Sequence, residues 1–400
     1  MKVVHVVTTT SGGAGIAAVR IHEALRAEGH DSAILALRHP SPSPDDGVVV
    51  FPTRFTRIWE RVAKRAGFPI RQSDKAEARL NKLDIHGISF SEPATDYDIA
   101  SHPMVREADV VHLHWVGGFL DWQSFFTRVE RPVVWTLHDQ NPFQGGFHLA
   151  SDVELWGKAV RDREREITDR KAEILRHFEG LHVVAPSEWT KARSMDSATL
   201  GRFPHSCIRN PIDATKWQPF DRVHARRVFD LPADAKVLLT VAERAAWTWK
   251  GADILNGALS QSALSTRYLW AAVGDEAGLT GVARPLGVLN DRRMMALAYS
   301  AADLFIHPSR EDNLPNVLLE SLVIGTPVVG HPVGGVPEII DDGVNGTIAA
   351  AVDSSALAAA ILRADGIEFD RRAIRDNASV AYDPTRIAKE YLTVYDTLIS

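Results

Sequence analysis

The sequence predicts an α/β protein with two domains, each built on a parallel sheet, and three observations lead to this. Short apolar runs rich in β-branched residues alternate with segments of helical periodicity, which is typical of strand–helix–strand units. The 400 residues exceed the length at which a single hydrophobic core keeps growing. The strand–helix pattern also restarts near residue 236. We place the domains at residues 1–206 and 207–384.

The composition narrows the class of protein. A formal charge of −6 argues against broad nucleic-acid binding, so we expect no nucleic-acid partner. The single cysteine, Cys207, allows no intrachain disulfide and fits a reducing compartment. No apolar run approaches the ~20 residues of a membrane span. The first ten residues predict a strand rather than a signal peptide. We therefore expect a cytoplasmic protein.

The chain opens with a strand, a glycine loop and a helix. Lys2–Thr8 is a continuous apolar strand, Ser11–Gly15 is the loop, and we expect the helix from Ile16 to about Glu28. Glycines let the backbone approach an anion, and the start of the helix faces it. The spacing is not G-x-G-x-x-G, and the second strand (31–37) is followed by no acid placed to hold a ribose. The pattern therefore argues against a dinucleotide-dependent dehydrogenase.

Histidines lie at the ends of two later strands. His112 and His114 share one face of the strand 109–115, and the strand 132–137 is followed by His138 and Asp139. Open parallel sheets bind ligands beyond the carboxyl ends of their strands. His112 and His114 could form a metal pair, but no third ligand has a suitable spacing, so we expect ordinary polar contacts.

Other polar stretches can be interpreted either as ordinary structural features or as functional sites. The basic amphipathic stretch 51–82 could meet an anionic membrane surface or acceptor, although packing on its own domain is the favoured interpretation. The loop sequence Asp96-Tyr97-Asp98 could hold a metal, but we interpret it as a chance match. We expect a mobile glycine-containing loop at 141–151 and a solvated helix face at 161–176.

The second half begins with a strand at 236–241, and two cations follow it. Arg244 and Lys250 flank the loop before a helix expected at 252–260. Two cations that converge on the N-terminus of a helix would hold a diphosphate, Arg through its planar fork and Lys as a point charge. The alternative is a pair of ordinary surface cations.

The chain is organised around residues 306–326. We expect Asn313 to cap a helix with Pro315 in its first turn, ending at Gly325. Asp312 and Glu320 stand eight residues apart, before and inside this helix. A buried carboxylate needs partners, and the hydroxyls of a ligand would supply them. The alternative is that Glu320 faces solvent and Asp312 is a cap acid.

Taken together, these motifs resemble retaining glycosyltransferases of family 4, which have the GT-B fold, and in particular enzymes of bacterial surface-polysaccharide assembly. The resemblance rests on the following residues, in family order: Gly12-Gly13, His112-Leu113-His114-Trp115, Trp135-Thr136-Leu137-His138-Asp139, Ala185-Pro186-Ser187, Arg244, Lys250-Gly251, Pro308-Ser309, Asp312 with Glu320, Gly325-Thr326-Pro327 and Gly334-Gly335-Val336-Pro337-Glu338.

The resemblance implies two Rossmann-like domains that face each other across a cleft, with the C-terminal helix (385–400) packing back on the first. The second domain would bind a UDP- or GDP-sugar and the first a glycan or lipid-linked acceptor. The implied catalytic residues are His138, Arg244, Lys250 and Asp312. The implied donor-binding residues are Gly12, Gly13, Arg244, Lys250, Leu289, Asp312, Asn313, Leu314, Pro315, Asn316 and Glu320. The acceptor-side candidates are His112, His114, Trp115 and Asp139.

The implied reaction is transfer of a hexosyl-type sugar without a metal or other cofactor, since fixed positive charge would stabilise the leaving diphosphate. Asp312 stands where the family usually has Glu and is one methylene shorter. Two alternatives remain: a non-hydrolysing sugar-nucleotide epimerase and a non-catalytic subunit that binds a nucleotide sugar. The implied location is the cytoplasm, with possible peripheral contact at the inner face of the membrane.

Overall fold

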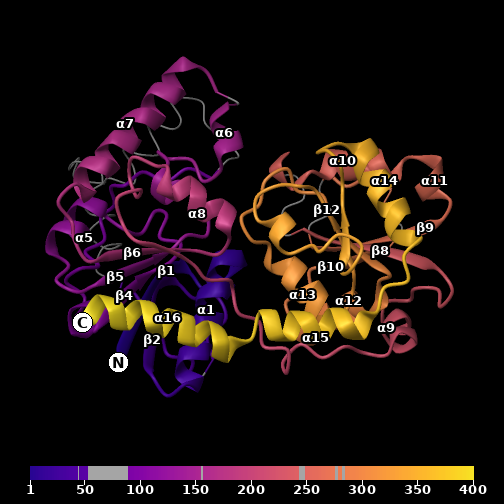
Figure 1. Ribbon diagram of the computed structural model, residues 1–400, viewed down its shortest axis with the longest axis horizontal. Coiled ribbons are helices and arrows are strands. Elements are labelled where there is room, and N and C mark those ends of the chain that lie inside the picture. Colours follow the sequence, from indigo (N-terminus) through magenta and orange to yellow (C-terminus); the bar gives the residue numbers. More distant parts are fainter. Residues whose placement is uncertain (44, 53–88, 155, 243–247, 275–277, 282–283) are drawn as a thin grey trace, which may run out of the picture. The chain divides into compact units, whose positions relative to one another are not determined.

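The computed structural model describes residues 1–43, 45–52, 89–154, 156–242, 248–274, 278–281 and 284–400 (Figure 1). The chain divides into two compact units, Met1–Arg209 with Thr385–Ser400, and Asn210–Pro384. Arg244, and the basic stretch from residue 53 onward, lie outside the described residues. No helix within the described ranges is long and apolar enough to cross a bilayer.

The first unit contains a seven-stranded parallel sheet in the order β3-β2-β1-β4-β5-β6-β7. The central strands β1, β4 and β5 are buried along almost their whole length because helices cover both faces of the sheet. The strands are β1 (Lys2–Thr9), β2 (Asp31–Arg38), β3 (Val48–Val50), β4 (Val110–Leu113), β5 (Val133–Thr136), β6 (Leu181–Ala185) and β7 (His205–Cys207). The helices are α1 (Gly12–Ala27), α4 (Pro103–Glu107), α5 (Trp122–Arg128), η1 (Asn141–Phe143), α6 (Ala150–Glu154), α7 (Lys158–Leu175), α8 (Glu188–Met195) and α16 (Pro384–Ile399).

The C-terminal helix α16 packs on the sheet of the first unit, beside α1. Tyr391 and Tyr395 are completely buried in a cluster with Val3 of β1, Val110 of β4 and Ile21 of α1. In Figure 1, α16 runs in yellow along the indigo and purple elements of this unit. The amphipathic pattern at the end of the chain therefore buries its apolar face on β-strands that are nearly the whole chain length away in sequence.

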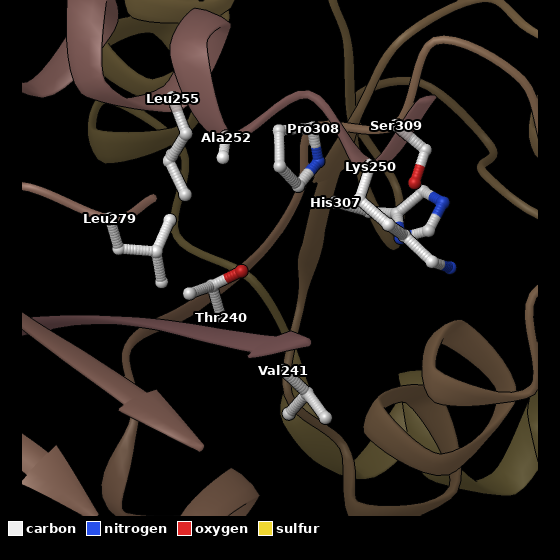
Figure 2. Close-up of a pocket in the computed structure, with 9 residues that line it drawn as sticks. All are labelled: Thr240, Val241, Lys250, Ala252, Leu255, Leu279, His307, Pro308 and Ser309. Atoms are coloured by element: carbon white, nitrogen blue, oxygen red, sulfur yellow. The ribbon is translucent and has the colours of Figure 1, made fainter. Parts of the chain in front are cut away.

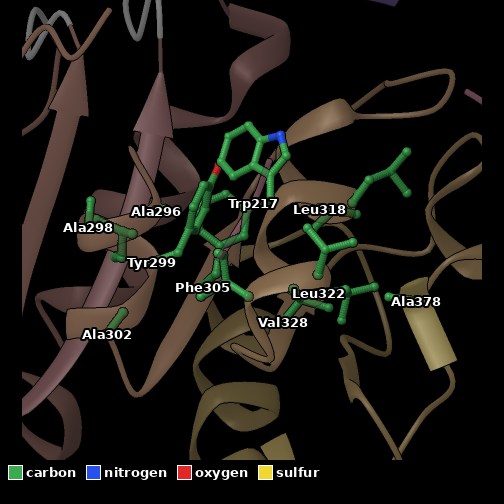
Figure 3. Close-up of a cluster of buried hydrophobic side chains, with 14 of the residues drawn as sticks. Trp217, Ala296, Ala298, Tyr299, Ala302, Phe305, Leu318, Leu322, Val328 and Ala378 are labelled. Carbon is green, nitrogen blue, oxygen red and sulfur yellow. The ribbon is translucent and has the colours of Figure 1, made fainter. Parts of the chain in front are cut away.

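The second unit contains a six-stranded sheet in the order β10-β9-β8-β11-β12-β13, whose pairings are parallel. Figure 3 shows the main core, where Tyr299, Phe305, Leu318 and Trp217 meet. The strands are β8 (Lys236–Ala242), β9 (Tyr268–Gly274), β10 (Arg284–Gly287), β11 (Leu304–His307), β12 (Val328–Gly330) and β13 (Gly346–Ile348). The helices are α9 (Arg222–Val228), η2 (Thr248–Lys250), α10 (Ala252–Leu259), α11 (Ser262–Ser265), α12 (Arg292–Ala301), α13 (Asn316–Ile324), η3 (Val336–Glu338), α14 (Ser354–Asp365) and α15 (Arg371–Ala381).

Two predicted helix starts were wrong. Helix α1 begins at Gly12, not at Ile16, so the glycines form its first turn instead of a loop before it. Gly15 permits this early start, because a Cβ there would lie 2.3 Å from the carbonyl oxygen of Thr9. Helix α13 is capped by Pro315 and starts at Asn316, so Asn313 belongs to the preceding turn and is not the cap.

Candidate functional site

In the second unit, polar residues gather at the carboxyl ends of β8 and β11, where open α/β sheets bind ligands. Figure 2 shows a small pocket there, with Lys250 and His307 on the same side of it. The pocket is lined by Thr240, Val241, Lys250, Ala252, Leu255, Leu279, His307, Pro308 and Ser309. Its walls come from β8, η2, α10 and the segment after β11, so the tertiary structure joins motifs that are about sixty residues apart.

Lys250 lies at the start of helix α10, next to the pocket. Its Nζ is 3.9 Å from the centre of the Trp249 ring and 3.4 Å from Oδ2 of Asp312. Gly251 caps α10 at φ +69°, and a Cβ at this position would lie 2.0 Å from the carbonyl oxygen of Pro308. The glycine therefore lets the segment after β11 approach the start of α10, which brings Lys250 and Asp312 together.

Asp312 is held between two basic side chains. Its Oδ2 lies 3.4 Å from Nζ of Lys250 and 3.5 Å from Nε2 of His307. Burial opposes ionisation of this carboxyl group, but the charge of Lys250 and the contact with His307 outweigh it and lower its pKa to about 2. Asp312 is therefore an anion at neutral pH and balances the charge of Lys250, which is not the role of a helix-cap acid.

The turn 312–315 leads into helix α13. The cap residue Pro315 makes no side-chain hydrogen bond, and the first turn of the helix contains no acid, so the positive end of the helix dipole faces this turn. Two glycines, Gly334 and Gly335, pack against the backbone of this turn. Gly335 N donates to the carbonyl oxygen of Asn313 at 2.9 Å, and a Cβ on Gly334 would lie 1.6 Å from that of Asp312. Leu314 is buried, and Oδ1 of Asn316 accepts from Asn210 at 3.1 Å.

Glu320 lies inside α13 and is only 7 % exposed, so it does not face solvent as the alternative interpretation had it. The hydroxyl of Tyr299 donates to its Oε2 at 3.2 Å. Tyr299 comes from α12 and is itself completely buried. Sequence reasoning missed this partner, because no local pattern connects a tyrosine on one helix with a carboxylate on the next.

Leu289 and the segment after Gly334-Gly335 make none of the contacts described above for Lys250, Asp312 and Glu320. Leu289 follows β10, is half-buried and packs against the core of its unit. The motif Gly334-Gly335 is followed by the one-turn 3₁₀ helix η3, since Pro337 and the turn at Asp341–Gly346 leave no room for a longer helix.

In the first unit, the start of helix α1 is open. Gly12 has φ +71°, Gly13 is exposed, and the first turn contains neither an acid nor a side-chain cap. Such a helix start offers backbone N–H groups and the positive end of the dipole to an anion. The geometry needed for an approach to phosphate is therefore present, in the first turn of the helix instead of in a loop.

His138 follows β5 and hydrogen-bonds inward. Its Nε2 lies 3.0 Å from Nδ1 of His114, and the two rings stack. Burial lowers the pKa of His138 to about 4, against a smaller opposite effect of Asp139. The imidazole is therefore neutral at physiological pH.

His112 and His114 are core residues and not surface contacts, which argues against their assignment to the acceptor side. Both are essentially unexposed. Nδ1 of His112 lies 2.7 Å from the hydroxyl of Tyr395, and its Nε2 lies 2.7 Å from Oγ1 of Thr136. His112 therefore connects β4 to α16 and β5.

A third imidazole stands beside them, contrary to the prediction from spacing. His5 of β1 pairs in register with His112, and one nitrogen from each of His5, His112 and His114 lies within 4.8 Å of the others. All six ring nitrogens of the three residues already have hydrogen-bond partners. A metal ion would have to displace these bonds, so we interpret the cluster as a hydrogen-bond network.

Trp115 and Asp139 form a second polar cluster. The indole N–H of Trp115 donates to Oδ2 of Asp139 at 2.7 Å, and the same carboxylate contacts Nδ1 of His148. Burial opposes ionisation of Asp139, but His148 and the N–H of Trp115 lower its pKa below the ordinary value. Asp139 thus fixes the segment after β5 through interactions with its neighbours.

The loop after Asp139 is firmly held, contrary to the predicted mobility, and α7 is not simply a solvated face. Lys171 is completely buried, and its ammonium donates to the carbonyl oxygens of Asn141 at 2.5 Å and Gly145 at 2.6 Å. The carboxylate of Glu164 accepts from N–H of Gly145 at 2.7 Å and of Gly146 at 2.6 Å. Two charged residues of one helix therefore bind the backbone of the loop.

Two parallel sheets covered by helices, with polar residues gathered at the carboxyl ends of the strands, define the class of α/β proteins that bind ligands at this edge of a sheet. The model of "Glycosyltransferase Family 4" matches residues 11–216, and that of "Glycosyl transferases group 1" matches residues 235–364. The chain belongs to glycosyltransferase family 4 and has the GT-B fold.

Two similar proteins are named as D-inositol 3-phosphate glycosyltransferases. A D-inositol 3-phosphate glycosyltransferase of Actinosynnema mirum is 31 % identical over 68 % of this chain and 67 % of its own length. One of Streptosporangium roseum is 29 % identical over 60 % of this chain. That match spans 57 % of the length of the Streptosporangium protein.

Similar solved structures support the fold. Anabaena Alr3699/HepE in complex with UDP-glucose superposes with a TM-score of 0.64 at 18 % identity, covering 99 % of this chain and 100 % of that one. Sucrose-phosphate synthase from Thermosynechococcus elongatus gives 0.66 at 18 % identity, covering 100 % and 99 % of the two chains.

Proposed function

We propose that this glycosyltransferase moves a hexosyl-type sugar from a UDP- or GDP-sugar to a glycan or lipid-linked acceptor, with retention of configuration and without a metal. The observation that carries the proposal is the contact between Lys250 and Asp312 at the strand ends of the second unit. This contact joins Lys250, at the start of α10, to the ionised Asp312, which precedes α13. Neither helix has a side-chain hydrogen bond from its cap residue.

The departing diphosphate needs fixed positive charge. Lys250 and the N-termini of α10 and α13 would supply it, together with Arg244. In the free protein Lys250 is neutralised by Asp312, so a bound diphosphate would take over as its partner. Groups that are already oriented towards the bound diphosphate need no further rearrangement when charge develops on the leaving group, so such a site would not need a metal.

The two acids would hold the sugar parts of the donor. We assign Glu320 to the ribose hydroxyls, since the burial of the carboxylate strengthens a hydrogen bond to it. We assign Asp312 to the transferred sugar, and the turn 313–316 and Leu289 to donor contacts. The short side chain of Asp312, held by Lys250 and His307, would restrict which sugar hydroxyl it reaches.

The first unit would contribute the acceptor side. We assign His138 to the reacting sugar and Gly12 and Gly13 to close approach of the helix start to phosphate. Trp115 and Asp139 would shape the acceptor side, with their polar atoms held by each other. His112 and His114 are left out of this set, because both are buried and all four of their ring nitrogens have hydrogen-bond partners.

UDP is the favoured donor nucleotide, since the similar Anabaena protein has been solved with UDP-glucose and UDP. Because the relatives from Actinosynnema mirum and Streptosporangium roseum are named D-inositol 3-phosphate glycosyltransferases, D-inositol 3-phosphate is an acceptor to test beside lipid-linked glycans. Peripheral contact of 51–82 with the inner face of the membrane remains part of the proposal.

The test is chromatography of nucleotides and sugars after incubation of the full chain with UDP- and GDP-sugars, acceptors and EDTA. Transfer releases free UDP or GDP and forms a glycosylated acceptor whose anomeric configuration NMR reads out. Epimerisation would leave the nucleotide attached to the sugar, and a non-catalytic subunit would give neither product. Either of these results, or activity abolished by EDTA, would contradict the proposal.

A further inference from the structure

A continuous hydrogen-bonded chain runs through the first unit and ends at His138. It starts at a backbone carbonyl group beside β3 and crosses α1, β2, β1 and β4 before it reaches the segment after β5. Its contacts are His22 Nε2 to Asp46 O at 3.0 Å, His22 Nδ1 to Ser32 Oγ at 2.8 Å, Ser32 Oγ to His5 Nε2 at 3.1 Å, His5 Nδ1 to His114 Nε2 at 2.9 Å and His114 Nδ1 to His138 Nε2 at 3.0 Å.

The first contact determines where the protons at that end lie. A backbone carbonyl oxygen can only accept, so Nε2 of His22 must carry a hydrogen and donate to Asp46. A neutral imidazole has one N–H, so Nδ1 of His22 is an acceptor. The hydroxyl of Ser32 therefore donates to His22 and is left to accept from the next member.

The same rule, one donor and one acceptor nitrogen in each neutral imidazole, applies to the next members of the hydrogen-bonded chain. Since Ser32 accepts, Nε2 of His5 carries the hydrogen and its Nδ1 accepts from Nε2 of His114. Nδ1 of His114 is then an acceptor, so Nε2 of His138 carries the hydrogen. Each step depends only on distances and on one proton per ring.

The requirement of one proton per ring is met by burial. His5, His22 and His114 are nearly unexposed, and burial lowers the pKa of all three. A second proton on any ring would place an uncompensated charge in the core of the unit, which is costly. The chain is therefore neutral at physiological pH, and its polarity has a single direction.

We propose that His22, Ser32, His5 and His114 are positioning residues that fix His138 as its Nε2–H tautomer and leave Nδ1 as a hydrogen-bond acceptor. Among the described residues, none hydrogen-bonds Nδ1 of His138. The group of a ligand that faces this nitrogen must then be a donor, such as a sugar hydroxyl. This last step rests on the proposed function, whereas the tautomer does not.

The direct test is NMR of the full chain with ¹⁵N-labelled histidine at pH 7, with the His138 signals assigned by their loss in His138→Gln. Long-range ¹H–¹⁵N correlations report which ring nitrogen is protonated. We expect a protonated Nε2 and an unprotonated Nδ1 in the wild type without ligand. A wild-type His138 that is protonated on Nδ1, or on both nitrogens, would overturn the proposal.

Two substitutions at Ser32 probe the middle of the chain. Ser32→Ala removes the hydroxyl that transmits the direction of the bonds from His22 to His5, and we expect an Nδ1–H population of His138 to appear. Ser32→Thr keeps the hydroxyl and should restore the wild-type tautomer. A folded Ser32→Ala protein with an unchanged His138 tautomer would contradict the proposal. If neither variant folds, the wild-type measurement still decides.

Kinetics separate positioning from general damage. We expect Ser32→Ala to lower kcat about tenfold with little change in the KM for the donor, as when a group that orients a functional histidine is removed. The Thr variant should recover most of kcat. If the NMR results hold but no sugar transfer occurs in any protein, the proposed function fails and the hydrogen-bonded chain stands.

Discussion

The ammonium group of Lys171 lies 2.6 Å from the carbonyl oxygen of Gly145, although the lysine side chain is completely buried. It also donates to the carbonyl oxygen of Asn141 at 2.5 Å. Backbone carbonyl groups in helix η1 and the following turn have no backbone donor, and this lysine donates to them in place of water. The loop that follows Asp139 therefore depends on one side chain of α7.

Replacing this lysine should destabilise the first unit. Lys171→Met keeps the length of the side chain but leaves both carbonyl oxygens buried without their donor, which we expect to cost about 3 kcal/mol in the free energy of unfolding. Urea titration followed by tryptophan fluorescence measures this. Lys389→Met, on the exposed side of α16, is the control and should change stability by less than about 0.5 kcal/mol.

The difference in the free energy of unfolding between the wild type and Lys171→Met should depend on pH. Burial lowers the pKa of Lys171 from 10.5 to about 7, so between these values the unfolded chain binds more protons at this site than the folded one. The free energy of unfolding of the wild type, relative to Lys171→Met, should then rise as the pH increases from 7 towards 10. A constant difference over this interval would show that the buried amine keeps its ordinary pKa, and a falling difference would show that folding raises it.

Glu164 should stabilise the same loop from the acceptor side. Glu164→Gln retains the shape but presents an amide NH₂ to one of the two N–H groups of Gly145 and Gly146, so one donor loses its partner. We expect a loss of about 1 to 3 kcal/mol in the free energy of unfolding. Glu166→Gln makes the same chemical change on the exposed side of α7 and should be nearly silent. Equal effects of the two changes would contradict the assignment.

Lys250 should matter for the reaction and little for folding. Lys250→Ala removes a fixed positive charge from the diphosphate site, and we expect kcat/KM for the donor to fall on the order of 10² to 10³-fold. Lys216→Ala, an exposed cation of the same unit, should leave it unchanged. Steady-state assays of nucleotide release measure both. Full activity in Lys250→Ala would mean that the donor site lies elsewhere.

Tyr299 and Glu320 should act together on donor binding. Glu320→Ala should weaken binding of the nucleotide sugar on the order of 10 to 100-fold, because the ribose hydroxyls lose a charged acceptor. Tyr299→Phe removes only the hydroxyl that orients Glu320, and we expect an increase in Kd of about fivefold. Isothermal titration calorimetry measures both values. We expect the double variant to lose less than the sum of the two single changes, whereas effects that simply add would show that the residues act independently of their hydrogen bond.

Some of the site could be predicted from the sequence because the signals are local. Apolar strands followed by glycine or by a cation before a helix predict where a parallel sheet ends and where an anion can bind, and Lys250 and Asp312 were found this way. The positions of His5, Lys171 and Tyr299 could not be predicted. His5 meets His112 only because β1 pairs with β4, more than a hundred residues away, in one particular register.

The sequence by itself determined the two α/β units, their strand and helix segments and the family, because hydrophobic periodicity and helix-breaking residues act within a few residues along the chain. Only the tertiary structure decided which polar groups are partners. The order and register of the strands bring the histidines of β1 and β4 into one chain, and the burial that follows makes them neutral and gives that chain its direction. The burial of a residue and its hydrogen-bond partners depend on tertiary contacts, and the local sequence around the residue does not specify them.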